Sequence, residues 1–200
     1  MSLSAQQAQA FLRPLQGKVV TFLVSSRDAN LSLIRGISLI GAAVAHDCTI
    51  LDVDAFYSSH SDEILSGLPQ SIVKQTSIYV PEPGSNIENE ILALLKSSSK
   101  LFVIESLNTL YHLFGSSGAS SRSRRLSFIL FTLSYLAKTS DRIGFLIMYE
   151  QERLARFSGK KTISNFADIT ISVEVIGSKL LMECVRGLTW PDGKFDFTFP

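Results

Sequence analysis

The segment between the first apolar strand and the first long helix is where a phosphate-binding loop would lie. Such loops follow the pattern G-x-x-x-x-G-K-[ST], whose glycines let backbone N–H groups close on phosphate while the lysine reaches the outer phosphates. On this chain the four defined positions hold Ser25, Asn30, Leu31 and Ser32. Both glycines and the lysine are replaced, and only the hydroxyl of Ser32, at the magnesium-binding position, is kept. The pattern predicts a nucleotide-binding core whose Walker A motif is degenerate.

Length and composition indicate the number of domains and say little about which partners the chain binds. Its 200 residues predict a single core domain over 17–200, preceded by an N-terminal helical segment over 1–16. The net charge of +1 gives no global attraction to nucleic acid or to a membrane surface, so such a partner would need a local patch. The scattered cysteines and histidines predict no metal site. No apolar run is long enough for a membrane span and no signal peptide is visible, which predicts a cytoplasmic protein without a membrane partner.

Apolar strand-like runs alternate with helical patterns as far as residue 149, and from residue 167 onward the pattern changes to strands joined by turns. Strands are expected at 18–24, 49–53, 77–81, 101–105 and 143–149, with helices at 4–12, 30–45, 61–75, 87–96 and 124–138 and a short helix ending at 114. Alternating strands at 168–175, 179–185 and 194–199 follow. The predicted fold class is α/β, a mostly parallel twisted sheet flanked by helices, with antiparallel C-terminal edge strands.

The order of these elements resembles the RecA-like ATPase core of the P-loop NTPase superfamily, and within it the archaeal RadA recombinases and their shorter paralogs. Three positions carry the likeness. Asp54 in ILDVDAFY stands where the family has its water-activating glutamate, Glu105 in LFVIES stands at the Walker B aspartate, and Gln151 in YEQ keeps the glutamine that couples nucleotide to DNA. The tail ECVRGLTWPDGKFDFTFP has the family's form, an arginine strand, a proline turn and a phenylalanine strand. The resemblance covers about residue 17 to the C-terminus.

The resemblance implies an inactive ATPase homologue with no catalytic residue and no cofactor. The missing lysine removes a phosphate contact worth about 4 kcal/mol at an effective dielectric near 20, and Leu31 supplies none of it. Asp54 and Glu105 would then be remnants at the sheet edge. A divergent ATPase that binds ATP and magnesium through backbone groups and Ser32 is the alternative.

The resemblance also implies two DNA-facing loops, both basic here. The first, GSSGASSRSRR, contributes Arg122, Arg124 and Arg125, and the second, QERLARFSGKKTISN, contributes Arg153, Arg156, Lys160 and Lys161. Flexible cationic loops suit phosphate contacts without base readout, although surface loops often carry such residues and bind nothing. Phe11 resembles the phenylalanine by which recombinases polymerise, but Pro14 replaces the alanine of that motif, so helix packing is the preferred interpretation.

The expected function is therefore a non-catalytic recombinase paralog that assists DNA recombination or repair. Its partners would be single-stranded DNA, a RecA-family recombinase, or further copies of itself. Besides the divergent ATPase, an ATPase-dead scaffold subunit resembling those of the Elongator complex, which handles tRNA, remains open.

Overall fold

The computed structural model describes residues 4–65, 70–82, 86–114, 118–150, 163, 165–187 and 194–198. The helices are α1 (Ala5–Leu12), the 3₁₀ turn η1 (Arg13–Leu15), α2 (Arg27–Ala43), α3 (Phe56–Ser59), α4 (Ser61–Leu65), α5 (Gln70–Gln75), α6 (Ile87–Leu95), α7 (Leu107–Leu113) and α8 (Ala119–Ser140). The strands are β1 (Val19–Val24), β2 (Cys48–Asp52), β3 (Thr76–Tyr79), β4 (Leu101–Glu105), β5 (Ile143–Tyr149), β6 (Ile169–Ile176), β7 (Lys179–Arg186) and β8 (Lys194–Thr198).

All the described strands join one sheet in the order β3-β2-β4-β5-β1-β6-β7-β8. The strands from β3 to β6 pair in parallel, and β7 and β8 each pair antiparallel with the strand before them. The predicted α/β class, with its antiparallel C-terminal strands, is confirmed. The antiparallel part begins later than expected, because β6 lies parallel to β1. The backbone N–H of Val19 donates to Asp168 Oδ2 (2.9 Å) and that of Asp168 donates to the carbonyl of Val19 (2.8 Å), which fixes the start of β6 beside β1.

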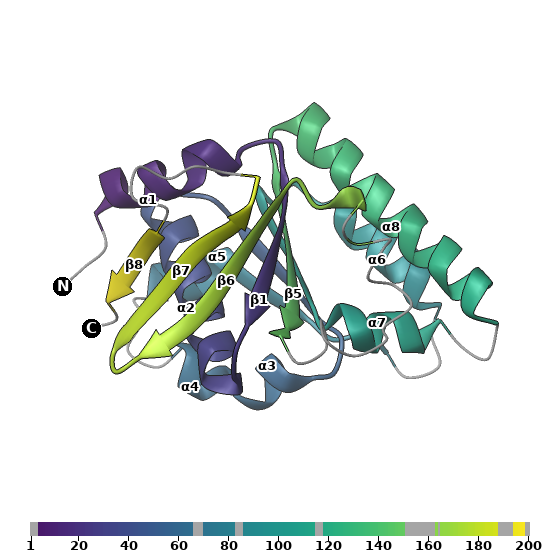
Figure 1. Ribbon diagram of the computed structural model, residues 1–200, viewed down its shortest axis with the longest axis horizontal. Coiled ribbons are helices and arrows are strands. Elements are labelled where there is room, and N and C mark those ends of the chain that lie inside the picture. The colour runs from purple at the N-terminus through teal and green to yellow at the C-terminus, as the bar shows by residue number, and fades with distance from the viewer. Residues whose placement is uncertain are drawn as a thin grey trace.

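Helices cover both faces of the sheet, so the core has two parts. Figure 1 shows α1 and α2 on one side and α6, α7 and α8 on the other. Successive residues of a buried strand point to opposite faces. On β5, Phe145 belongs to the cluster that includes Ile34 of α2, whereas Leu146 belongs to the cluster that includes Leu133 of α8. The sheet therefore stands between two apolar layers.

Two helices begin earlier than the sequence predicts, and both shifts affect predicted sites. The helix α2 starts at Arg27 because the Ser26 hydroxyl accepts a hydrogen bond from the N–H of Ala29 (3.1 Å), a side-chain cap. The helix α8 starts at Ala119, whose carbonyl accepts a hydrogen bond from the Tyr111 hydroxyl (3.3 Å). Residues 119–125, predicted as part of a flexible loop, are therefore helical.

The N-terminal helix is part of the core. The Ser4 side chain caps α1, in a capping box with Gln7. Phe11 is 1% exposed, and its ring centroid lies 4.9 Å from that of Phe195 on β8. A side chain buried in this way is not free to insert into a neighbouring molecule. Among the described residues, no helix is both long and apolar enough to cross a bilayer.

Candidate carboxylate site at the edge of the sheet

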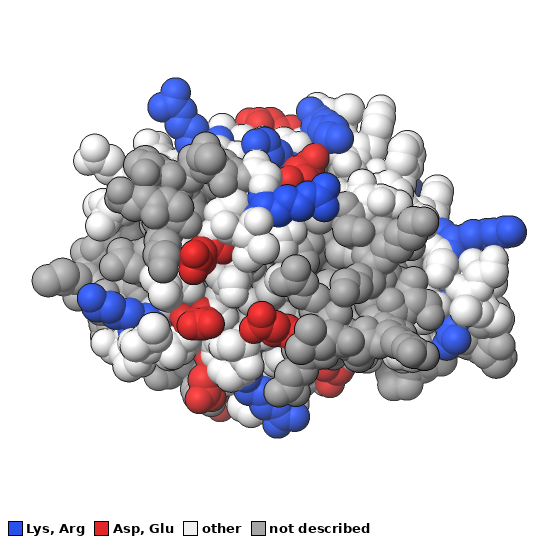
Figure 2. Space-filling view, in the orientation of Figure 1, with Lys and Arg blue, Asp and Glu red and all other residues white. Residues whose placement is uncertain are grey.

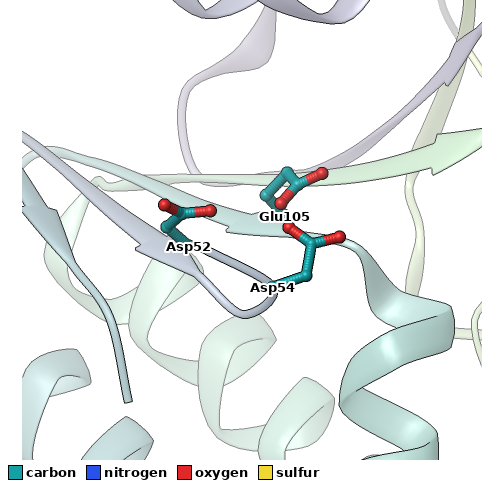
Figure 3. Close-up of side chains that lie close together, drawn as sticks. All are labelled: Asp52, Asp54 and Glu105. Atoms are coloured by element: carbon teal, nitrogen blue, oxygen red, sulfur yellow. The ribbon is translucent and has the colours of Figure 1, made fainter. Parts of the chain in front are cut away.

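Three carboxylates meet where β2 and β4 end. Asp52 and Glu105 are the last residues of these neighbouring parallel strands and pair in register, and Asp54 follows in the turn after β2. One oxygen of each carboxylate lies within 4.8 Å of the others (Figure 3). Because the carboxyl ends of parallel strands share one edge of a sheet, residues distant in sequence converge there.

Asn30 of α2 connects this cluster to two tyrosines. Its side-chain amide nitrogen donates to Glu105 Oε1 (3.3 Å) and to the Tyr149 hydroxyl (3.0 Å), while its oxygen accepts from the Tyr57 hydroxyl (2.5 Å). Asn30 and Tyr57 are fully buried. The amide thus satisfies polar groups from β4, β5 and α3 at once.

The two aspartates also hold the chain that leaves β2. Asp52 Oδ2 accepts a hydrogen bond from the N–H of Ser58 (2.7 Å), and Asp54 Oδ1 accepts from the N–H of Phe56 (3.3 Å). Carboxylates at these first N–H groups favour the start of the short helix α3. Asp52 is 0% exposed, so its role is in part structural.

Burial leaves the cluster short of compensating charge. Asp52 Oδ1 and Glu105 Oε2 are buried, and neither has a hydrogen-bond donor among the described residues. Burial raises the pKa of Glu105 to about 9, helped by the negative charge of Asp54, by a hydrogen bond shared with Asp54 and by the charge of Asp52, while the Asn30 amide acts in the opposite direction. Glu105 therefore keeps a proton at neutral pH and donates it toward Asp54. Burial also raises the pKa of Tyr57 well above its usual value, and the charge of Glu105 adds to this effect.

The donor set is one of oxygens, which is what magnesium and calcium prefer. A cation can bind to all three carboxylates only if Glu105 loses the proton that its burial retains. Ser32, at the position of the expected hydroxyl ligand, lines a separate pocket together with Leu31, Arg35, Ile64, Val175, Gly177 and Ser178.

The connection between β1 and α2 leaves no room for a phosphate-binding loop. It consists of Ser25 and Ser26 alone, where the pattern G-x-x-x-x-G-K-[ST] would need a wide turn of glycine backbone. The N–H of Ser25 donates to the Val173 carbonyl (3.2 Å), and Ser26 caps the helix with its own hydroxyl. Leu31, at the lysine position, lies inside α2. Of the predicted nucleotide positions, the structure brings together Asn30, Asp54 and Glu105. Leu31 and Ser32 line the separate pocket, and Ser25 bonds to β6. Gln151 lies outside the described residues.

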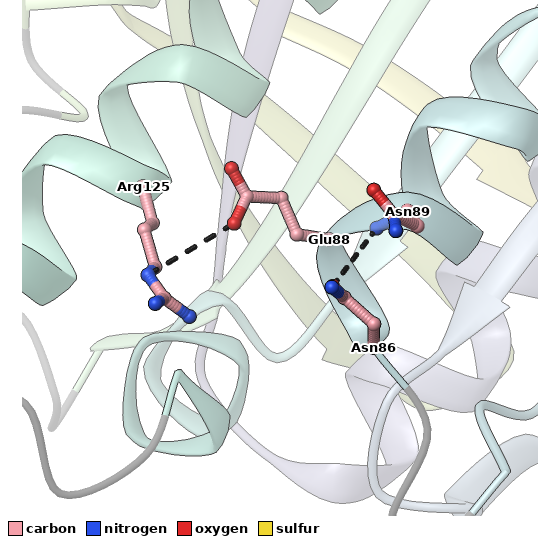
Figure 4. Close-up of polar contacts among 4 residues, drawn as sticks. All are labelled: Asn86, Glu88, Asn89 and Arg125. Carbon is pink, nitrogen blue, oxygen red and sulfur yellow. Dashed lines mark hydrogen bonds and ion pairs between the residues drawn. The ribbon is translucent and has the colours of Figure 1, made fainter.

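Two of the basic residues predicted to contact DNA are engaged within the protein. The guanidinium of Arg122 lies 5.0 Å from the centroid of the Tyr111 ring, and Arg125 Nε lies 3.9 Å from Glu88 Oε2 (Figure 4). Arg124 is exposed. The strands β4 and β5 are neighbours in the sheet, but Arg153, Arg156, Lys160 and Lys161 lie outside the described residues. On the face drawn in Figure 2, Lys and Arg side chains stand among acidic and uncharged ones.

Sequence reasoning missed three members of the site. Asp52 was visible as an acid that ends a buried strand, but its register with Glu105 is known only from the structure. Tyr57 and Tyr149 gave no signal, because their contacts with Asn30 join segments far apart in the chain.

Comparison with known proteins adds no relative. No protein-family model matches the chain, and no curated protein matches it. By its fold and its site, the chain is an α/β protein with buried carboxylates at the carboxyl edge of a mostly parallel sheet.

Proposed function

We propose that this chain is a non-catalytic, RecA-like paralog of recombinases, which assists DNA recombination or repair by binding DNA, a partner recombinase, or both. The observation that carries the non-catalytic part is the two-residue connection between β1 and α2. Phosphate catalysis needs backbone N–H groups and a cation around the transferred group. Here the N–H of Ala29 donates to the Ser26 hydroxyl, and the N–H of Ser25 donates to the Val173 carbonyl of β6. The lysine position holds Leu31.

Mg-ATP provides the direct test of the non-catalytic part. A ligand that binds only the folded state adds RT ln(1 + [L]/Kd), which for millimolar ligand and a micromolar site is about 4 kcal/mol and a rise of several degrees in Tm. We expect no magnesium-dependent shift in a thermal melt and no phosphate release. A clear shift would favour the divergent ATPase instead.

The nucleic-acid part depends on the segment 151–162 and on Arg124. Phosphate contacts release counterions, so binding of single-stranded DNA should weaken steeply with salt. Changing Arg153, Arg156, Lys160 and Lys161 together to glutamate should abolish that binding while α8 stays intact. Titrations of single-stranded DNA and of tRNA, by fluorescence anisotropy at several salt concentrations, would check this. Preference for tRNA would favour a scaffold resembling the Elongator subcomplex.

The recombination assignment has its own test. The chain is added to a strand-exchange reaction run by the RecA-family recombinase of the same cell. Faster exchange, together with co-elution of the two proteins, is the expected result. An unchanged rate without co-elution would remove the assignment to recombination and leave the non-catalytic fold unaffected.

A further inference from the structure

The outer face of α8 is aromatic and open to solvent. Phe128, Phe131 and Tyr135 are 50%, 57% and 58% exposed. The opposite side of the same helix is buried against the sheet through Leu126, Ile129, Leu130, Leu133 and Ala137. A helix that is apolar on two opposite sides is typical of a position between two layers. In the described part of the chain, only one of those layers is present.

The exposed residues follow the spacing of a helix-packing seam. Arg124, Phe128, Phe131, Tyr135 and Lys138 are separated alternately by four and three residues, the spacing that keeps side chains on one side of a helix. We call these five residues the seam. At 1.5 Å per residue the seam is about 21 Å long, enough for four turns of a second helix.

Two threonine hydroxyls beside the seam already have hydrogen-bond partners within α8. The Thr132 hydroxyl donates to the Phe128 carbonyl (2.9 Å), and the Thr139 hydroxyl donates to the Tyr135 carbonyl (2.8 Å). Neither hydroxyl therefore needs a donor or an acceptor from a partner. Covering the seam would bury apolar area without stranding these polar groups, which is the condition for favourable docking.

Charge decides between a second copy and a different protein. The seam carries Arg124 at one end and Lys138 at the other, and the sequence of α8 contains no Asp or Glu. An antiparallel second copy would place Arg124 against Lys138, and a parallel one would place each cation against itself. Both arrangements oppose like charges, which disfavours pairing. At the far right of the face in Figure 2, where α8 begins in Figure 1, the charged side chains in view are Lys and Arg, while acidic side chains are in view near the top, where α8 ends.

We propose that the seam docks an amphipathic helix of a partner protein, with large apolar side chains spaced by four and three residues and acidic side chains at both ends. The aromatic rings of Phe128, Phe131 and Tyr135 supply the buried centre, where interface energy concentrates. The positive charges of Arg124 and Lys138 favour a partner with negative charge at these positions and raise the rate of association. This proposal does not depend on the recombination assignment, because it rests on α8 alone.

A designed peptide pair tests the chemistry of the partner directly. The first peptide is a labelled helix of about three heptads, with leucine at the seam-facing positions and glutamate beside them. The second differs only in having lysine for glutamate. Fluorescence anisotropy with the full chain should show saturable binding of the acidic peptide and at least tenfold weaker binding of the basic one. Equal binding of both peptides, or binding of neither, overturns the proposal.

Matched variants test where the peptide binds. Phe128→Ser, Phe131→Ser and Tyr135→Ser combined should weaken binding of the acidic peptide at least tenfold. The control is Ile176→Ser, which changes an apolar side chain that is 62% exposed on the β6–β7 hairpin and should bind as the unchanged chain does. Circular dichroism and Tm establish that both variants fold. Unchanged affinity in the triple variant overturns the assignment to the seam.

Two further measurements separate other occupants from a helical partner. Aromatic and basic side chains together can also stack and bind single-stranded nucleic acid. Binding of single-stranded DNA should be the same for the triple variant and the unchanged chain, and its loss would assign the seam to nucleic acid and overturn the proposal. Sedimentation should show no dimer that the triple variant dissociates, since such a dimer would make a second copy the occupant.

Discussion

At the scale of single residues, Glu105 makes stability depend on pH. Its pKa is about 9 in the folded chain and 4.5 as the unperturbed value, so the folded state holds a proton that the unfolded state has released. The stabilisation that the folded state gains by holding this proton is fully present below pH 4.5 and is lost as the pH rises toward 9. The free energy of unfolding then changes with a slope of up to about 1.4 kcal/mol per pH unit. The free energy of unfolding should therefore fall across this window.

Glu105→Gln should remove most of that dependence. Glutamine keeps the shape of the side chain, can accept from Asn30, and can donate to Asp54 without titrating. At pH 8 the variant should be more stable than the unchanged chain by on the order of 3 kcal/mol. Urea unfolding at several pH values, with EDTA present, measures this. Asp62→Asn, the same change of charge at an exposed site, should leave the pH slope as it is.

Asn30→Ala should be strongly destabilising. The substitution leaves the Tyr57 hydroxyl without its acceptor and Glu105 and Tyr149 without a donor, all at a buried or partly buried position. Stranded buried polar groups cost about 1–3 kcal/mol each when uncompensated, and a loss of about 2–4 kcal/mol is expected here. Denaturant unfolding compares this variant with Asn89→Ala on the exposed side of α6, which should change stability by less than about 0.5 kcal/mol. Equal losses of unfolding free energy in both variants would mean that the hydrogen bonds of the buried Asn30 amide do not stabilise the fold.

At the scale of elements, the close approach of α8 to β5 depends on Gly144. A Cβ at this position would lie 2.8–3.0 Å from the side-chain carbons of Leu133, so Gly144→Ala must displace the helix or the leucine. Overpacking of this kind costs about 1–3 kcal/mol. Combining it with Leu133→Ala should cost less than the sum of the two single changes, because the second change makes space for the first. Additive losses in a double-mutant cycle would show that the two sites do not touch.

At the scale of the whole molecule, the predicted N-terminal segment 1–16 belongs to the same core as the sheet. Phe11, Leu12 and Leu15 of this segment are buried in the cluster that contains Phe22 and Phe145. Phe11→Ala should therefore lower the free energy of unfolding by about 3–5 kcal/mol. Gln9→Ala, on the exposed side of α1, is the control. A loss within experimental error for Phe11→Ala would mean that α1 folds apart from the sheet.

The sequence by itself determined the order and class of the elements. Apolar runs such as Val19–Val24 and Ile143–Tyr149 are typical of central strands buried on both faces, and the turn at Gly177 between alternating runs predicts a hairpin. These are local signals, which depend on neighbours along the chain. The loss of the phosphate-binding residues was equally visible, because that chemistry depends on residue types at fixed spacing.

Only the tertiary structure decided which residues meet. The register of β2 with β4 places Asp52 beside Glu105, and the packing of α2 on the sheet brings Asn30 to both Glu105 and Tyr149. In α8, Arg122 contacts the Tyr111 ring of α7, a contact between two elements, whereas the Ser26 cap at the start of α2 is a local signal. Propensity is a weak constraint at the end of a helix, whereas contacts between distant segments are set by the packing of the whole chain.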